Sequence, residues 1–139
     1  AERDGGMLRS CAEAAARVLA EPGERVVLHG DLHHENILDF GPRGWRAIDP
    51  KAVEGDRCFD YVHLFFDPDD AQVPDLDAIL HQLALTARLA GIDPDRLRTW
   101  LLAWAGLSAV WWLEHGESAE PALTVASMLA PTVSEDSRA

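Results

Sequence analysis

The sequence predicts an α+β domain that is mainly helical and carries one small β-hairpin. Apolar side chains recur at helical spacing over much of the chain, whereas the β-branched runs are short. A Gly-Pro-Arg-Gly turn at residues 41–44 separates two of these short runs, which is typical of a hairpin. The length of 139 residues suits one domain with a sizeable core, so we expect residues 1–139 to fold as a single unit.

The first half of the chain is expected to contain one helix and three short strands. Residues 7–20 place apolar side chains near one helical face, and the following Pro-Gly pair ends the pattern. Residues 26–28 are apolar and rich in valine, which predicts a strand. Residues 37–40 and 45–48 are expected to form the two strands of the hairpin.

After Asp60 the pattern becomes helical, with about five helices expected in all. Asp75 is a suitable N-cap for a helix over residues 76–90, and Gly91 can end that helix. Asp93 is the N-cap expected for the next helix, over residues 94–115, which has proline at its favoured first position.

The helix expected over residues 94–115 is apolar on nearly every side, which is typical of a centrally buried helix. Its Trp100, Trp104 and Trp111 recur at helical spacing, so we expect them to pack in the core. Ser118 can cap a last helix that extends to residue 129.

Composition restricts the classes of partner. The formal net charge of −12 disfavours nucleic acid and anionic membranes as partners and is compatible with a cationic small molecule. Two cysteines are too few for a disulfide scaffold, no signal peptide opens the chain, and the longest uncharged run has 15 residues. Together these features predict a cytoplasmic protein.

Several polar residues and both cysteines are expected to have structural or solvated positions. We expect Cys11 and Cys58 to pack in the core and His63, His81 and His115 to lie on the surface or on a helix face. We expect Asp67, Asp69 and Asp70 to form a solvated loop.

The segment from residue 29 to residue 60 contains the residues suited to chemistry. Asp31 and Asn36 lie between the short strand and the hairpin, and Asp49 follows the second hairpin strand, so folding of the hairpin should return Asp49 to the Asp31–Asn36 loop. Two carboxylates and a carboxamide form a set of hard oxygen ligands suited to Mg²⁺. Phosphoryl transfer uses such a set, with one aspartate on the attacking hydroxyl and the other two residues on the metal.

These residues resemble a known family. His29-Gly30-Asp31 followed five residues later by Asn36, then Ile48-Asp49-Pro50-Lys51, and finally Asp60 are similar, in order and spacing, to the motifs of aminoglycoside phosphotransferases. The Ile-Asp-Pro-Lys form is most similar to the streptomycin 6-phosphotransferase and hydroxyurea phosphotransferase branch. The resemblance covers residues 26–62 closely and the flanking helices loosely.

The resemblance implies a fold, a reaction and a role for each of these residues. The fold would be the C-terminal lobe of a protein-kinase-like enzyme, with the hairpin carrying the catalytic loop, and the reaction would be ATP-dependent phosphorylation of a hydroxyl on a streptomycin-like aminoglycoside. Asp31 would be the catalytic base, and Asn36 and Asp49 would hold Mg²⁺. His29 and Asp60 would brace the loop.

Two features of the sequence indicate which part of such an enzyme the chain contains. The chain has no glycine-rich loop after a strand, and its single lysine, Lys51, lies downstream of the catalytic loop. We therefore expect the nucleotide-binding N-terminal lobe to be absent from residues 1–139 and the activity to require that lobe. Glu114 and Glu117 are candidate contacts for a cationic substrate.

Two alternative functions remain open at this point. The chain could be a non-catalytic binding module, or could form a homodimer through apolar surface that the missing lobe would cover. Alternatively, His29, His33 and His34 could form a transition-metal site in a metal-dependent hydrolase, because imidazole clusters suit Zn²⁺ or Fe²⁺.

Overall fold

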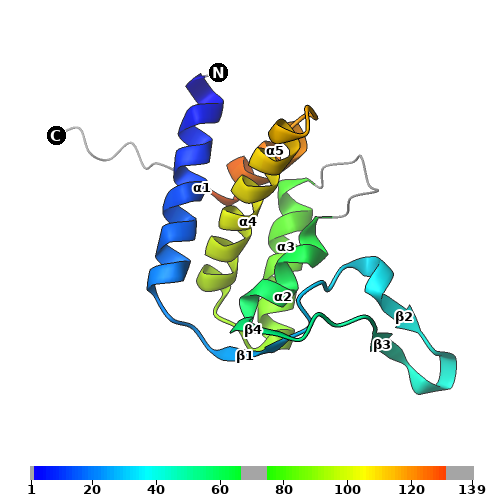
Figure 1. Ribbon diagram of the computed structural model, residues 1–139. Coiled ribbons are helices and arrows are strands. Elements are labelled where there is room, and N and C mark those ends of the chain that lie inside the picture. The colour runs from blue at the N-terminus through cyan, green and yellow to red at the C-terminus, as the bar shows by residue number, and fades with distance from the viewer. Residues whose placement is uncertain (1, 67–74, 131–139) are drawn as a thin grey trace.

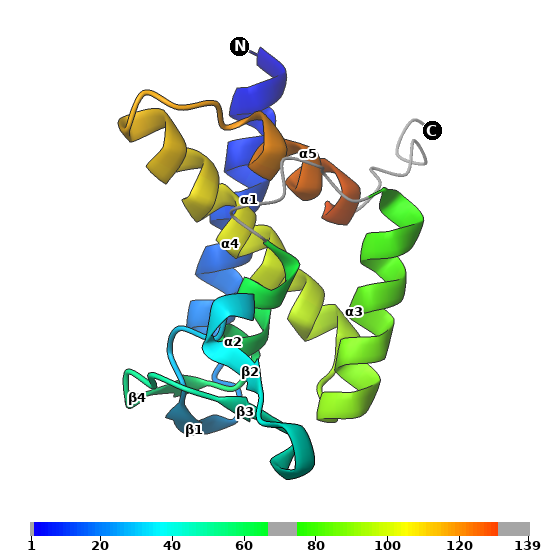
Figure 2. The same ribbon diagram turned by 90° about the vertical axis from the view of Figure 1, so that its right-hand side faces the viewer.

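The computed structural model describes residues 2–66 and 75–130 and shows a mainly helical α+β fold (Figures 1 and 2). The expected acidic loop of Asp67, Asp69 and Asp70 lies outside the described residues. The elements in chain order are α1 Glu2–Ala20, β1 Arg25–Leu28, a 3₁₀ turn His34–Asn36, β2 Ile37–Asp39, a 3₁₀ turn Gly41–Arg43, β3 Trp45–Ala47, β4 Val53–Asp56, α2 Cys58–Val62, a 3₁₀ turn His63–Phe65, α3 Leu76–Ala90, α4 Pro94–Glu114 and α5 Glu120–Leu129.

Helix α4 is the centre of the helical part and contacts α1, α2, α3 and α5 (Figure 1). Its N-terminus is capped by Asp93, whose carboxylate accepts hydrogen bonds from the peptide N–H groups of Asp95 and Arg96. Helix α3 is capped in the same way by Asp75 and ends at Gly91 in the left-handed conformation, so both expected caps are confirmed.

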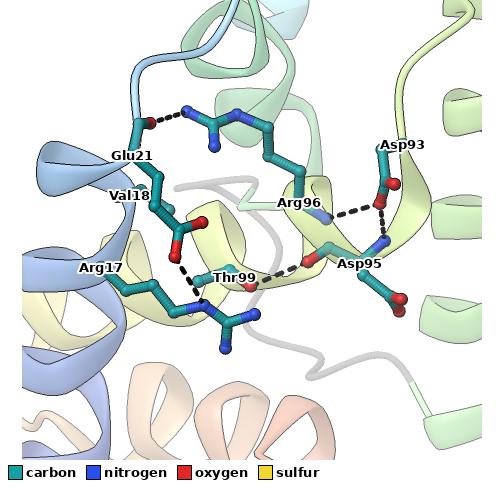
Figure 3. A pocket seen from close by; sticks show the side chains of 7 residues that line it. All are labelled: Arg17, Val18, Glu21, Asp93, Asp95, Arg96 and Thr99. Carbon is teal, nitrogen blue, oxygen red and sulfur yellow. Dashed lines mark hydrogen bonds and ion pairs between the residues drawn. The ribbon is translucent and has the colours of Figure 1, made fainter.

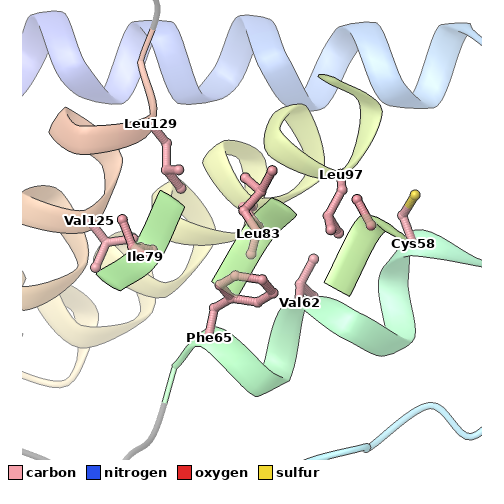
Figure 4. Packing of buried hydrophobic residues seen from close by; sticks show 10 residues of the cluster. Cys58, Val62, Phe65, Ile79, Leu83, Leu97, Val125 and Leu129 are labelled. Atoms are coloured by element: carbon pink, nitrogen blue, oxygen red, sulfur yellow. The ribbon is translucent and has the colours of Figure 1, made fainter. Parts of the chain in front are cut away.

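The main core lies where α2, α3 and α5 meet α4 (Figure 4). It is built from apolar side chains and one cysteine, namely Cys58, Val62, Phe65, Ile79, Leu83, Ala87, Leu97, Leu101, Val125 and Leu129. A second cluster, mostly of small residues, joins α1, α4 and α5. A Cβ atom at Gly106 would lie 2.3 Å from Cys11 Cβ, so glycine is what allows α1 and α4 to approach so closely. Both cysteines are buried and unpaired, as expected.

The strands form two separate two-stranded antiparallel sheets. The expected hairpin of β2 and β3 is confirmed, with Ile37 opposite Ala47. The pairing of β1 with β4 was not predicted; it sets Arg25 opposite Asp56 and Leu28 opposite Val53. Because β1 and β4 enclose the hairpin in sequence, their pairing closes the segment between them into one loop region.

Two expectations about the helices are wrong. Helix α1 begins at Glu2 rather than at residue 7. Helix α4 has buried residues from Leu97 to Ala109, but its later turns also expose large apolar side chains: Leu107 is 60% exposed and Trp111 is 50% exposed. The described helices cover one side of α4 at that end, so Trp111 is not a core residue and instead packs beside His115, with the ring centroids 4.2 Å apart.

None of the helices in the described part of the chain combines the length and the apolar character needed to cross a bilayer.

Candidate active site

The loop that follows β1 is held by a carboxylate from α2. Asp60 accepts hydrogen bonds from the peptide N–H groups of His29 and Gly30, both at 2.8 Å and through different oxygens. Hydrogen bonds to a charged acceptor are stronger than those to a neutral one. The helix therefore fixes the backbone of the loop immediately before Asp31.

Gly30 is required by the geometry of this loop. Its φ is +84°, in the region that favours glycine, and a Cβ atom there would lie 2.9 Å from Val53 Cγ2 and 3.1 Å from Lys51 Cβ. The absence of a side chain at Gly30 lets β4 and the segment before it pass close to the loop.

The imidazole of His29 joins the loop to the end of the hairpin. Its Nδ1 accepts a hydrogen bond from the peptide N–H of Asp31 at 3.2 Å, so Nε2 carries the proton and donates to the carbonyl oxygen of Ile48 at 2.6 Å. The carbonyl oxygen of His29 accepts from the peptide N–H of Lys51 at 2.6 Å. These bonds place the segment of residues 48–51 beside the loop.

Asn36 is buried, and its amide is oriented by two neighbours. Its Nδ2 donates to the carbonyl oxygen of Asp31 at 2.9 Å and to His33 Nε2 at 3.1 Å. Its carbonyl oxygen on the main chain accepts from the peptide N–H of Ile48 at 2.9 Å. Both Nδ2 protons are thus in use, while Oδ1 accepts no hydrogen bond from the residues the structure describes.

Asp49 lies directly after Ile48, which bonds to both His29 and Asn36. Its side chain is exposed, and its backbone is left-handed at φ 56°, which is costly for a residue other than glycine and recurs at functional sites. A carboxylate and an amide oxygen fit Mg²⁺, which proteins commonly bind through one or two carboxylates together with substrate phosphates.

The carboxylate of Asp31 is 36% exposed. Its Oδ2 lies 3.8 Å from His33 Nε2 and 4.0 Å from Lys51 Nζ. Asp31 is thus a reachable carboxylate on a loop whose backbone is fixed by Asp60, His29 and Asn36, which is the arrangement needed to orient a hydroxyl and take its proton.

The three histidines expected for a hydrolase centre do not converge. His29 bonds to main-chain groups, His33 accepts from Asn36, and His34 is exposed. Among residues 2–66 and 75–130, no three His, Cys, Asp or Glu side chains form a group that could hold a metal ion. The metal-hydrolase interpretation therefore lacks its centre.

Glu114 and Glu117 lie away from the loop. Both are exposed, one at the end of α4 and the other in the turn that follows. Glu114 is ten residues beyond Trp104, which is about 15 Å along a helix axis. Trp104 is the α4 residue that packs against His63, which follows α2 and lies near Asp31. The structure does not bring these two glutamates to Asp31.

His63, which the sequence predicted to lie on the surface or on a helix face, is a neighbour of the loop. Its ring is half-buried, with centroids 4.6 Å from Trp104 and 5.3 Å from Phe59, and its Nε2 is buried without a partner in the described chain. Burial lowers the pKa of His63, although Asp31 and Asp60 act in the opposite direction. The signal in the sequence is the i, i+4 pair Phe59 and His63, which faces the i, i+4 aromatic residues of α4.

A hollow of about 360 Å³ lies between α1 and the start of α4, apart from the loop (Figure 3). The guanidinium of Arg96 crosses it, donating to the carbonyl oxygen of Glu21 at 2.8 Å and pairing with Asp56. Burial by itself raises the pKa of Asp56, but the hydrogen bonds from Arg96 and from the Cys58 N–H outweigh it and hold that pKa below its usual value. We assign this hollow a structural part, because its polar groups satisfy one another.

Comparison with known proteins identifies the family of the chain. Residues 1–116 match the family described as aminoglycoside/hydroxyurea antibiotic resistance kinase. The chain is 46% identical over 114 residues to streptomycin 3″-kinase of Klebsiella pneumoniae, a match that covers 78% of the chain and 43% of the relative. It is 37% identical over 120 residues to hydroxyurea phosphotransferase of Kitasatospora aureofaciens (86% of the chain, 34% of the relative) and 33% identical over 131 residues to streptomycin 6-kinase of Streptomyces glaucescens (91% of the chain, 42% of the relative).

The chain thus spans less than half the length of these three relatives. No solved structure gives a significant match. Because the family match covers most of the chain and includes the whole loop region, the chain belongs to the aminoglycoside/hydroxyurea antibiotic resistance kinase family.

Proposed function

We propose that this chain is the catalytic-loop portion, equivalent to a kinase C-terminal lobe, of an ATP-dependent phosphotransferase that acts on a hydroxyl of a streptomycin-like aminoglycoside. The observation that carries the proposal is the reachable carboxylate of Asp31 on a loop fixed by Asp60 and His29. Family membership supports the reaction type, and the names of the relatives support the substrate class.

In the proposed reaction Asp31 orients the substrate hydroxyl and accepts its proton as the oxygen attacks the terminal phosphorus of ATP. A new bond forms between that oxygen and phosphorus. The bond from phosphorus to the bridging oxygen breaks, and its electron pair leaves with ADP. Asp60 and His29 keep the loop backbone in place, so that Asp31 does not have to be ordered during the reaction.

Asn36 and Asp49 would hold the Mg²⁺ that accompanies the nucleotide. Asn36 Oδ1, which accepts no hydrogen bond from the described residues, and the exposed carboxylate of Asp49 would supply the oxygen ligands, and the cation would neutralise charge on the phosphates. The remaining contacts to ATP would come from a separate nucleotide-binding lobe. The net charge of −12 favours the approach of a substrate with several cationic groups.

The test measures transfer of labelled terminal phosphate from ATP to streptomycin by the complete gene product that contains this chain, with Asp31→Asn as the inactive control. Product that forms with the wild type and is lost in Asp31→Asn would support the proposal. Product with hydroxyurea but not with streptomycin would change the substrate class and leave the reaction standing. Absence of transfer to both compounds would overturn the proposal.

A second candidate function, a non-catalytic module that binds a second copy of the chain, is favoured by one observation. Leu107, Val110, Trp111 and Leu113 expose much of their side chains along one end of α4. Light scattering after gel filtration distinguishes the two candidates. A dimer that Trp111→Glu converts to a monomer, combined with absence of phosphoryl transfer, would favour the module.

A further inference from the structure

Lys51 is the chain's single lysine, and it lies beside the carboxylate proposed as the catalytic base. Its Nζ is 4.0 Å from Asp31 Oδ2. The lysine side chain is 60% exposed, so this pair is an exposed one that contributes little to stability. The ammonium is therefore free to contact a ligand that Asp31 also contacts.

The backbone around Lys51 is held in an uncommon conformation. Asp49 and Ala52, on either side of Pro50 and Lys51, both have left-handed backbones, at φ 56° and 50°. Such a conformation is unfavourable for a residue other than glycine and persists only where the surroundings enforce it. The hydrogen bond from the Lys51 N–H to the carbonyl oxygen of His29 is one such constraint, and it holds the Lys51 backbone beside the loop.

His33 is the other basic side chain near Asp31, with its Nε2 3.8 Å from Asp31 Oδ2. That Nε2 is also hydrogen-bonded to Asn36 Nδ2 at 3.1 Å, so the ring is committed to contacts within the loop. Of the two basic side chains that approach Asp31 within the described residues, Lys51 is the more exposed, at 60% against 28%, and is the one available to a ligand.

We propose that Lys51 is a further catalytic residue, whose ammonium contacts the phosphoryl group during its transfer to the hydroxyl held by Asp31. This inference rests on the proposed function. A hydroxyl poised for attack lies between its base and the phosphorus, so a cation about 4 Å from the base is within reach of the phosphoryl oxygens. Charge spread over those oxygens in the transition state is stabilised by a fixed cation, which also offsets the repulsion between the phosphoryl group and Asp31.

The experiment compares Lys51→Met and Lys51→Arg with the wild type in the complete gene product, using kcat and the KM values for ATP and streptomycin. Arg46→Met is the matched control, because it removes one positive charge from an exposed position on β3. Lys51→Met should lower kcat by about 10²-fold with KM changed far less, since the contact acts on the transition state. Lys51→Arg should recover most of that loss, and Arg46→Met should leave kcat within about twofold of the wild type.

Each other outcome has a definite meaning. An active wild type whose Lys51→Met variant keeps its kcat would overturn the role of Lys51 and leave the proposed function intact. Equal losses in Lys51→Met and Lys51→Arg, together with a lower melting temperature, would assign Lys51 a purely structural part and also overturn the inference. An inactive wild type would overturn the proposed function itself, and this inference with it.

Discussion

The loop region between residues 29 and 57 and the helical part of the chain are stabilised by different interactions. In the loop region the one buried residue is Asn36, and it is polar. In helices α3, α4 and α5, by contrast, every buried residue is apolar or glycine. The helices therefore gain their stability from the removal of apolar surface from water, whereas the loop depends on a few directional hydrogen bonds.

Because of this difference, the residues that shape the site are not the residues that contribute most to the stability of the fold. A carboxylate such as Asp60, which accepts two N–H groups, sets the position of a backbone without burying a core. A substitution in the loop should therefore change the geometry of the site and leave the helices folded, whereas a substitution in the core should lower the free energy of unfolding of the whole chain. Four variants test this separation.

Asp31→Asn should have the largest effect of the four variants, and it should change turnover without changing stability. General-base catalysis contributes about 10²–10⁴-fold, so kcat of the complete gene product should fall by that factor while the melting temperature stays unchanged. Glu35→Gln, which alters an exposed acid of the same loop, is the control and should retain its kcat. Near-native turnover of Asp31→Asn would remove Asp31 from its proposed role.

Leu101→Ala should have the largest effect on stability. Leu101 is fully buried in α4, so the lost packing should lower the free energy of unfolding by about 2–5 kcal/mol. Leu107→Ala makes the same chemical change six residues along the same helix at an exposed position, and should cost well under 1 kcal/mol. Urea denaturation of both variants measures the difference, and equal costs would mean that α4 is not packed as described.

Asp60→Asn should affect the loop backbone but not the helical core, because it weakens the link between α2 and the loop. Asparagine can accept through one oxygen but no longer carries the charge, so one loop N–H loses its partner at a cost of about 1–3 kcal/mol. Hydrogen exchange of the His29 and Gly30 amides should accelerate, while the amides of α4 should keep their protection. Asp39→Asn, which weakens one exposed turn bond to Gly41, should leave both sets unchanged. Unaltered exchange at His29 and Gly30 in Asp60→Asn would contradict the bracing role.

Asp56→Asn should change how stability depends on pH, because the Asp56 carboxylate is only 12% exposed and is paired with Arg96. It should also lower the free energy of unfolding at neutral pH, since the guanidinium loses its charged partner. Its pKa is lower in the folded chain than in the unfolded chain, where aspartate titrates near 4. The unfolded state therefore binds the proton more readily, and the stabilisation present above about pH 4 is lost as the pH falls through the lower folded value. Urea denaturation from pH 6 to pH 3 should show a shallower loss of stability for Asp56→Asn than for the wild type, with the exposed Asp95→Asn matching the wild type.

Local patterns in the sequence were sufficient for part of the fold. The caps Asp75 and Asp93, the end of α3 at Gly91 and the hairpin turn after Asp39 each depend on residues within a few positions of one another, so their chemistry can be read along the chain. The spacing of Asp31, Asn36 and Asp49 likewise selected the residues that the structure places in or beside one loop.

Contacts between distant residues were decided only by the tertiary structure. The pairing of β1 with β4, the exposure of Trp111 and the burial of His63 against Trp104 depend on which elements cover one another, and periodicity along a single helix cannot specify this. The approach of Lys51 to Asp31 needed the Gly30 contact and the left-handed backbones of Asp49 and Ala52. The sequence by itself thus determined the family, most of the helices and the polar residues of the loop, because those are local patterns. The tertiary structure decided which of those residues meet, because burial and proximity are properties of the packed chain.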